Sequence, residues 1–179
     1  MQCEVIKSMQ NDFLSLIFPK VCYACGKSLF KREDCICTYC HYHLPRTNFH
    51  LHPDNPVTKL FWGRTNIYSA AALYLFNKGS KVQYLIHQLK YRGKKEIGLS
   101  LGKQYGKDLK TTPLFSSEDM VIPVPLHQKK LKKRGYNQSE LFAEGLEESM
   151  EVENEKSVLI RAYTSQTQTR KSRFSRWKN

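Results

Sequence analysis

The stretch Cys22–Cys40, CYACGKSLFKREDCICTYC, holds five of the six cysteines of this chain. Cys22 and Cys25 form one C-x-x-C pair, and Cys37 and Cys40 form a second. Two such pairs are typical of a structural zinc site, in which four thiolates about 2.3 Å from the ion close a tetrahedron and leave no position open for catalysis. We therefore predict a zinc ribbon over residues 21–46, with Gly26 in the tight turn after the first pair.

Disulfides, a redox pair and plain buried thiols each fit the cysteine pattern less well than zinc does. Structural disulfides are rare in the cytosol, a redox motif has no reason to occur twice at this spacing, and buried thiols need no pairing. Within the zinc interpretation, Cys35 could replace Cys37, and His41 or His43 could replace Cys40. The spacing favours Cys22, Cys25, Cys37 and Cys40 as the ligands.

Composition and charge limit the class of protein. The chain has 179 residues, of which 40% are apolar, enough for a core. No apolar run is long enough to span a membrane, and residues 1–20 predict an amphipathic helix rather than a signal peptide, so we expect a cytoplasmic protein. The net charge of +13 favours polyanionic partners such as nucleic acid, nucleotides or diphosphate metabolites.

Beyond the cysteines, prolines mark residues 47–64 as a linker, and residues 65–179 read as one α/β domain. We predict one helix capped by Ser80 and another capped by Asn137, because each cap is followed three residues later by Gln or Glu. Apolar runs predict strands at Ile67–Phe76, Met120–Val124 and Ser157–Tyr163. Strands that alternate with helices indicate a mostly parallel sheet, with Met120–Val124 buried on both faces.

Glycine recurs at every fourth position in Gly98, Gly102 and Gly106. Each glycine costs a helix about 1 kcal/mol relative to alanine, so a packing reason is expected. We predict that this small-residue strip lets the helix approach the sheet closely.

Several segments, taken in order, resemble the ComF family, the phosphoribosyltransferase-like proteins associated with natural transformation. They are FPKVCYACG with the second C-x-x-C, LIHQLKYRGKKEIG, VIPVPLHQKKLKKRGYNQSELFAEGL, and RAYTSQTQTRKSRFSRWKN. LKYRG and the VPLH…RGYNQ core are the specific elements of this resemblance, which covers nearly the whole chain. It implies a type I phosphoribosyltransferase-like parallel sheet, here incomplete, behind a small N-terminal zinc ribbon.

The resemblance also implies a ligand, phosphoribosyl pyrophosphate, held with Mg²⁺ in the complete domain at the carboxyl ends of parallel strands. Its phosphates need backbone N–H groups and cationic side chains. The matching positions here are Lys90, Arg92, Lys133, Arg134, Asn137 and Gln138.

The sequence departs from the family at one element. In type I enzymes, an apolar strand is followed by two acidic residues and a Thr/Gly-rich turn. In this chain, Glu118 and Asp119 precede their strand, and no such turn comes after it. The chain ends at Asn179, shortly before the position where that loop would lie. We therefore expect a truncated or frameshifted member, or a chain designed to end there, with phosphoribosyl transfer lost or weakened.

Two non-catalytic functions compete with transfer. The first is binding of single-stranded DNA and of competence or recombination proteins, through basic residues interleaved with aromatic ones. Its candidates are Lys129, Lys130, Lys132, Arg173, Arg176 and Trp177. The second is docking of a protein partner on the ribbon, around Tyr39, His41, Tyr42 and His43.

Overall fold

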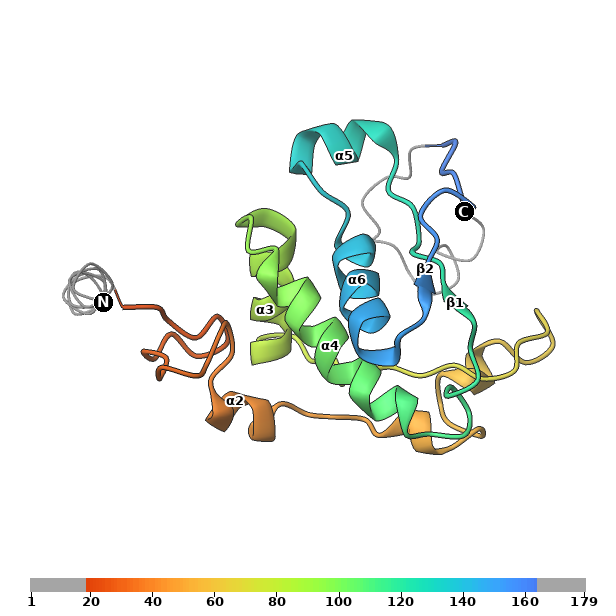
Figure 1. Ribbon diagram of the computed structural model, residues 1–179, viewed down its shortest axis with the longest axis horizontal. Coiled ribbons are helices and arrows are strands. Elements are labelled where there is room, and N and C mark those ends of the chain that lie inside the picture. Colours follow the sequence, from red (N-terminus) through yellow and green to blue (C-terminus); the bar gives the residue numbers. More distant parts are fainter. Residues whose placement is uncertain (1–18, 164–179) are drawn as a thin grey trace, which may run out of the picture.

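The computed structural model describes residues 19–163 of the chain. Its elements, in chain order, are α2 (Thr38–His43), η1 (Phe49–Leu51), η2 (Thr58–Leu60), α3 (Lys81–Tyr91), α4 (Glu96–Lys110), β1 (Met120–Val121), α5 (Gln128–Arg134), α6 (Gln138–Met150) and β2 (Glu153–Asn154). Figure 1 shows α3, α4 and α6 at the centre, with the cysteine-containing segment at one end of the molecule and the strands at the other. Most of the helix predicted for residues 1–20 lies outside this range, because the structure does not describe residues 1–18.

Helix α3 forms as predicted, because its cap is encoded locally. The Ser80 side chain accepts a hydrogen bond from the Gln83 backbone N–H at 3.3 Å, and the Gln83 side chain accepts one from the Gly79 N–H at 2.6 Å. These bonds satisfy N–H groups that a helix start leaves free. The buried face of α3 carries Val82 and Leu85, and Ile86 and Leu89 pack beside them, as the spacing of apolar residues predicts.

The glycine strip of α4 makes a close contact, but the predicted partner was wrong. The strip packs against helix α6, not against a sheet. A Cβ on Gly102 would clash with the Phe142 backbone oxygen and lie 2.9 Å from Gly145 Cα. Figure 1 shows the two helices crossing at the centre of the molecule. The two backbones approach so closely because glycine is present on both sides.

Helix α6 begins at the predicted cap. The Asn137 side-chain oxygen accepts from the Ser139 N–H at 3.1 Å, and its Nδ2 donates to the Val124 carbonyl at 3.0 Å and to Glu140 Oε1 at 3.1 Å. Asn137 is only 3% exposed. One side chain therefore starts α6 and also ties it to the segment after β1.

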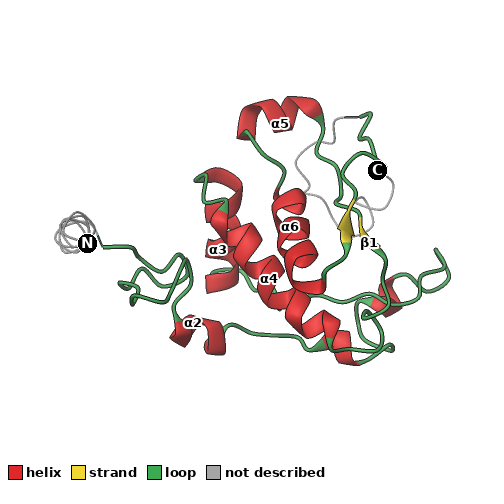
Figure 2. Cartoon of the chain, in the orientation of Figure 1, coloured by secondary structure: helices red, strands yellow, loops and turns green. Residues whose placement is uncertain are grey.

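The sheet is much smaller than predicted. β1 and β2 pair in parallel, with Met120 opposite Glu153 and Val121 opposite Asn154. The parallel direction agrees with the prediction, but Met120 is 46% exposed, so burial of this strand on both faces was wrong. Figure 2 shows how little of the described chain is strand.

Two predicted strands are absent. Residues 157–163 form no strand, and the chain pairs earlier, at β2. Ile67–Phe76 is extended but forms only one isolated antiparallel bridge, between Tyr74 and Arg46. An apolar run becomes a strand only when a neighbouring strand satisfies its backbone groups, and here these runs lack one. The described chain is therefore mixed helical with a two-stranded parallel sheet.

The cysteine-containing segment shares its core with the helices. Cys22, Cys37 and Cys40 belong to one buried cluster with Leu85 of α3 and Ile97 of α4. A second cluster lies around Tyr105, Leu109 and Met150, where α4 meets α6. Within residues 19–163, no helix is both long and apolar enough to cross a lipid bilayer.

Candidate metal centre and cationic cluster

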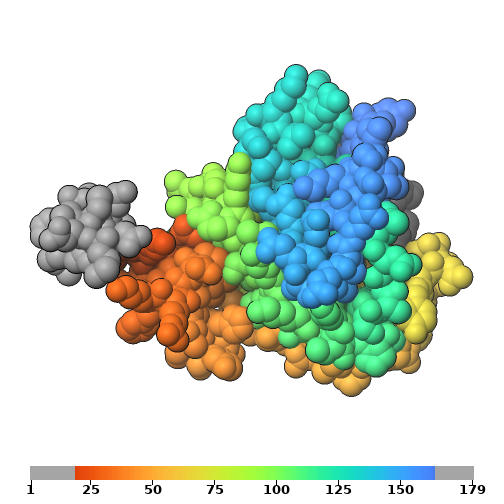
Figure 3. Space-filling view, in the orientation of Figure 1, coloured from red at the N-terminus to blue at the C-terminus, as the bar shows by residue number. Residues whose placement is uncertain are grey.

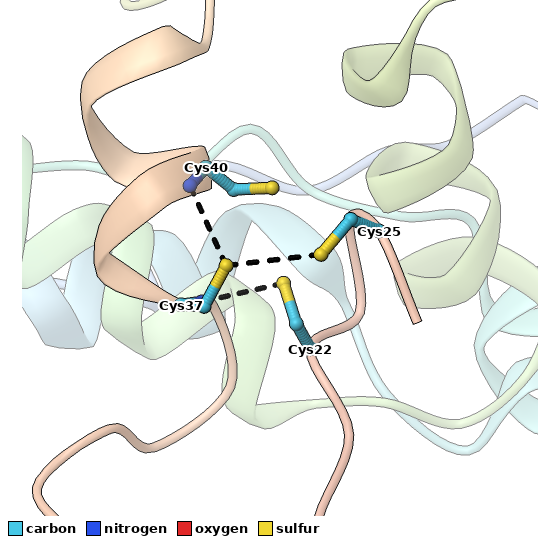
Figure 4. A group of neighbouring side chains, drawn as sticks. All are labelled: Cys22, Cys25, Cys37 and Cys40. Atoms are coloured by element: carbon cyan, nitrogen blue, oxygen red, sulfur yellow. Dashed lines mark hydrogen bonds between the residues drawn. The ribbon is translucent and has the colours of Figure 1, made fainter. Parts of the chain in front are cut away.

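The four predicted ligands, Cys22, Cys25, Cys37 and Cys40, lie together. Their sulfur atoms are all within 4.8 Å of one another. Figure 4 shows the four side chains converging from two segments, the turn that carries Cys22 and Cys25 and the start of α2. All cysteines of the described residues are free thiols, so the disulfide alternative receives no support.

Local sequence explains how each pair turns its sulfurs inward. In the first pair, Gly26 adopts φ +76° and its N–H donates to the Cys22 carbonyl at 2.8 Å. A left-handed φ of this kind favours glycine. In the second pair, Cys37 caps α2, and its sulfur accepts from the Cys40 N–H at 3.4 Å. Gly26 therefore lies in a turn as predicted, and the four sulfurs of both pairs come together in a cluster that could hold a metal ion.

Backbone N–H groups stabilise negative charge on one of the sulfurs. Cys22 Sγ accepts from the N–H of Ala24 at 3.4 Å and from that of Cys37 at 3.3 Å. Burial raises the pKa of Cys22, but these donors outweigh burial and bring its pKa to about 7. Burial and the neighbouring thiols raise the pKa of Cys40 and of Cys37. Four thiolates at this spacing would repel one another, and a bound cation would remove that repulsion.

The donor set fits a tetrahedral metal ion. Ligands about 2.3 Å from zinc stand about 3.8 Å from each other in a regular tetrahedron. The Cys25 and Cys37 sulfurs are 3.7 Å apart, which matches that edge. Four sulfur ligands are typical of structural zinc, and the cluster could hold such an ion.

The alternative ligands lie outside this cluster. The Cys35 thiol is buried and donates to the Glu96 carbonyl at 3.9 Å, so it faces α4. His43 Nδ1 is 2.8 Å from the Tyr39 carbonyl oxygen, and the His43 ring stacks on the Tyr39 ring. His41 lines a cleft beside α4. The spacing argument had favoured the same four cysteines.

Of the residues predicted to bind anions, the structure brings Lys90 and Arg134 together. Lys90 is exposed, but partial desolvation at the end of α3 lowers its pKa, and the positive charge of Arg134 lowers it further. The Arg134 guanidinium lies 5.9 Å from the centre of the Tyr91 ring. No ion pair that the structure describes includes Lys90 or Arg134. We call Lys90 and Arg134 the cationic cluster.

A residue outside the predicted set holds this cluster in place. The Tyr136 hydroxyl donates to the Leu89 carbonyl, which joins the chain after α5 to the end of α3. The Tyr136 ring is 8% exposed, and Lys95 Nζ lies 5.1 Å from its centre. The position of Tyr136 within the basic KKRGYNQ motif was the signal in the sequence, and it did not reveal the partner.

The other predicted anion-binding residues differ in their surroundings. Arg92 and Lys133 are exposed, at the ends of α3 and α5. The side chain of Asn137 caps helix α6 and is therefore already hydrogen-bonded. Gln138, the first residue of α6, has a buried Nε2 without a hydrogen-bond partner among the described residues. Only part of the predicted set is therefore free to contact a ligand.

The nucleic-acid candidates divide between α5 and the end of the chain. Lys129, Lys130 and Lys132 lie on α5, which Figure 1 shows at the periphery of the molecule, away from the crossing of α4 and α6. Arg173, Arg176 and Trp177 lie outside the described residues. Lys129 and Lys132 are exposed.

A second aromatic and basic arrangement was not predicted. The Tyr39 ring stacks on His43 with centroids 4.0 Å apart, and it is 59% exposed. Lys27 Nζ lies 5.9 Å and Lys81 Nζ 5.4 Å from the centre of the Tyr39 ring. The lysines come from segments far from Tyr39 in the sequence, so spacing alone could not have shown this group.

The chain was compared with protein-family models, with curated proteins and with solved structures. None of the three comparisons gave a match.

Proposed function

We propose that this chain is a phosphoribosyltransferase-like protein of the ComF family, and that its cationic cluster binds the diphosphate of phosphoribosyl pyrophosphate. The observation that carries the proposal is that the Arg134 guanidinium lies 5.9 Å from the ring of Tyr91, the neighbour of Lys90 at the end of α3, and that neither cation has an acidic partner among the described residues. The likeness of LKYRG and KKRGYNQ to the family supports the choice of ligand.

The electrostatics favour a doubly charged ligand. Two neighbouring cations repel each other. The pKa of Lys90 is lowered by desolvation and by this repulsion from Arg134. A phosphate placed between them would remove the repulsion and accept charge-assisted hydrogen bonds from both. The buried Gln138 Nε2 at the start of α6 offers a further donor on the same segment as Arg134.

We propose binding rather than efficient transfer. Transfer through an oxocarbenium-like sugar depends on positioning of the ribose and on electrostatic stabilisation. The sequence has no strand followed by paired acids and a Thr/Gly turn, since Glu118 and Asp119 precede β1. The four-cysteine centre then has a structural role with zinc, which a reducing, cytoplasmic location would permit.

Calorimetry and thermal melting with phosphoribosyl pyrophosphate and Mg²⁺ test this proposal. Ligand at 100 times its Kd should stabilise the protein by about 2.7 kcal/mol. Arg134→Gln and Lys90→Gln should each weaken binding by about tenfold, the value of one charge-assisted contact. Lys129→Gln, an exposed lysine on α5, is the matched control and should bind normally. No melting shift in the wild type, or equal binding by all variants, would refute the proposal.

Binding of single-stranded DNA is a second candidate, favoured by the group around Tyr39. An exposed ring flanked by Lys27 and Lys81 suits stacking of a base with phosphates beside it. The family's association with transformation supports DNA, and competence or recombination proteins, as partners. The same likeness includes the basic helix α5 with Lys129, Lys130 and Lys132.

Fluorescence anisotropy with a labelled oligonucleotide tests the second candidate. The affinity should fall steeply with salt, and Tyr39→Ala should cost about 1–3 kcal/mol, the value of one base–aromatic stack. Tyr68, which is 78% exposed elsewhere, provides the control variant Tyr68→Ala. Equal affinity for both variants, or no binding at low salt, would exclude the Tyr39 group as the DNA contact.

A further inference from the structure

A cleft of about 890 Å³ lies between α4 and residues 19–46, which we call the cysteine module. Figure 3 shows the two parts side by side, the module in orange and α3 and α4 in green. One wall carries Lys20, Tyr23 and Cys35, and the opposite wall is a face of α4 with Ser100 and Gln104. The glycine face of α4 packs on α6, so a different face of the same helix is open to this cleft.

Gln104 presents a hydrogen-bond donor at this cleft without a partner. The Tyr74 hydroxyl donates to Gln104 Oε1 at 3.4 Å. The Gln104 Nε2 is buried and has no partner among the described residues. A buried N–H group without a partner costs about 1–3 kcal/mol, so an acceptor from a ligand would be stabilising here. Gln104 also lines a smaller adjoining cavity of about 330 Å³.

The charges around the cleft favour an anion. The cleft has three acidic residues, of which Glu96 is engaged by the Tyr23 hydroxyl at 2.6 Å and Asp108 by Arg46, while Asp34 stands against the basic residues Lys20, Lys94 and Lys107. Among the described residues, neither Lys20 nor Lys107 forms an ion pair, although both line the cleft. They stand on opposite walls, so each adds positive charge to the cleft, and Lys107 on α4 offers an unpaired ammonium group to a phosphate.

The size of the cleft suits more than a simple phosphate. Its α4 wall extends from Glu96 to Asp108, a rise of about 18 Å along a helix. Small-molecule sites commonly measure about 300–1,000 Å³. This length leaves room for a sugar and a base beside a phosphate, and a base offers acceptors to the Gln104 amide.

We propose that this cleft is a second ligand site, separate from the cationic cluster, and that it binds a nucleoside monophosphate. The phosphate contacts Lys107, Lys20 on the opposite wall adds positive charge, and a ring or sugar acceptor takes the hydrogen bond from Gln104 Nε2. Of the cysteines of the module, Cys35 lines this cleft, whereas the four predicted metal ligands are not among its lining residues.

Titration calorimetry of the full chain loaded with zinc tests the proposal, with AMP, CMP, GMP and UMP as the ligands. At least one should bind with a Kd below about 1 mM. Lys107→Gln, at an exposed position that should not affect folding, and Gln104→Met should each weaken binding by about tenfold. Lys78→Gln, at an exposed lysine outside every proposed site, is the matched control and should bind as the wild type does.

Arg134→Gln separates this site from the proposed phosphoribosyl pyrophosphate site. It should leave nucleotide binding unchanged, whereas it should weaken phosphoribosyl pyrophosphate binding. The inference is wrong if none of the four nucleotides binds, if Lys107→Gln and Gln104→Met bind normally, or if Arg134→Gln abolishes nucleotide binding. Failure of the phosphoribosyl pyrophosphate experiment alone would leave this result intact.

Discussion

Replacing Gly102 by alanine tests the contact that organises the helices. The added Cβ would clash with the Phe142 backbone oxygen and lie 2.9 Å from Gly145 Cα. Both obstacles are backbone atoms, which cannot rotate away, so α4 and α6 must separate. Overpacking of this kind costs about 1–3 kcal/mol, and we take about 3 because no side chain can yield.

Helix propensity acts in the opposite direction. Alanine stabilises a helix by about 1 kcal/mol relative to glycine. The net expectation for Gly102→Ala is therefore a loss of about 2 kcal/mol in the free energy of unfolding, and a fall in Tm of about 4–8 °C. Urea denaturation followed by circular dichroism, with the slope held equal between variants, measures this difference.

Gly106→Ala is the matched control on the same helix. There the first obstacle is Ser149 Oγ, the end of a side chain that can rotate, while Ser149 Cβ lies 3.1 Å away. We expect Gly106→Ala to change stability by less than about 1 kcal/mol, and Gly106→Ala with Ser149→Ala to be no worse. If Gly102→Ala proves as stable as the wild type, the close approach of the two helices is not a feature of the protein in solution.

Further predictions concern the metal, the cationic cluster and a cap. Chelation of the metal, or Cys40→Ser, should remove hydrogen-exchange protection from Leu85 of α3 as well as from the cysteine module, because they share one core; protected α3 amides would contradict this. Lys90→Gln should raise stability at pH 7 by about 0.5 kcal/mol, measured by urea denaturation. The pKa of Lys90 is lowered by burial and by Arg134, so this gain should disappear as the pH rises towards 10.5, and a constant gain would contradict it. Asn137→Ala should cost about 1–2 kcal/mol in the same assay, and Asn137→Asp, which keeps the cap, should recover about half; equal losses would show that the cap contributes little.

The convergence of the four cysteines and the helix starts could be predicted because their causes are local. A C-x-x-C pair brings two sulfurs together within one turn, and Ser80 and Asn137 each satisfy N–H groups within the next few residues. Such interactions need no knowledge of the rest of the chain. For the same reason Gly26, with its left-handed φ, could be assigned to a turn from sequence alone.

The strands and the partner of the glycine strip could not be predicted in this way. Ile67–Phe76 has the composition of a strand, but apart from one isolated bridge its backbone groups pair with side chains and loop residues, such as Asn55 and Thr58 on the Ala70 carbonyl. The strip around Gly102 shows that some backbone comes close, and only the fold reveals that this backbone is α6. Strand pairing and helix packing depend on which distant segment of the chain folds against a given segment. A local sequence pattern contains no information about that partner.

The sequence by itself determined that four thiols can gather, that two helices begin at Ser80 and Asn137, and that the chain carries a large positive charge. Tertiary structure decided which charges meet. Lys90 lies beside Arg134 because the Tyr136 hydroxyl binds the end of α3. The physical reason is the distance along the chain over which each interaction acts. Backbone geometry and helix capping involve residues a few positions apart, whereas the electrostatic field at a site is the sum over all charges that the folded chain brings near it.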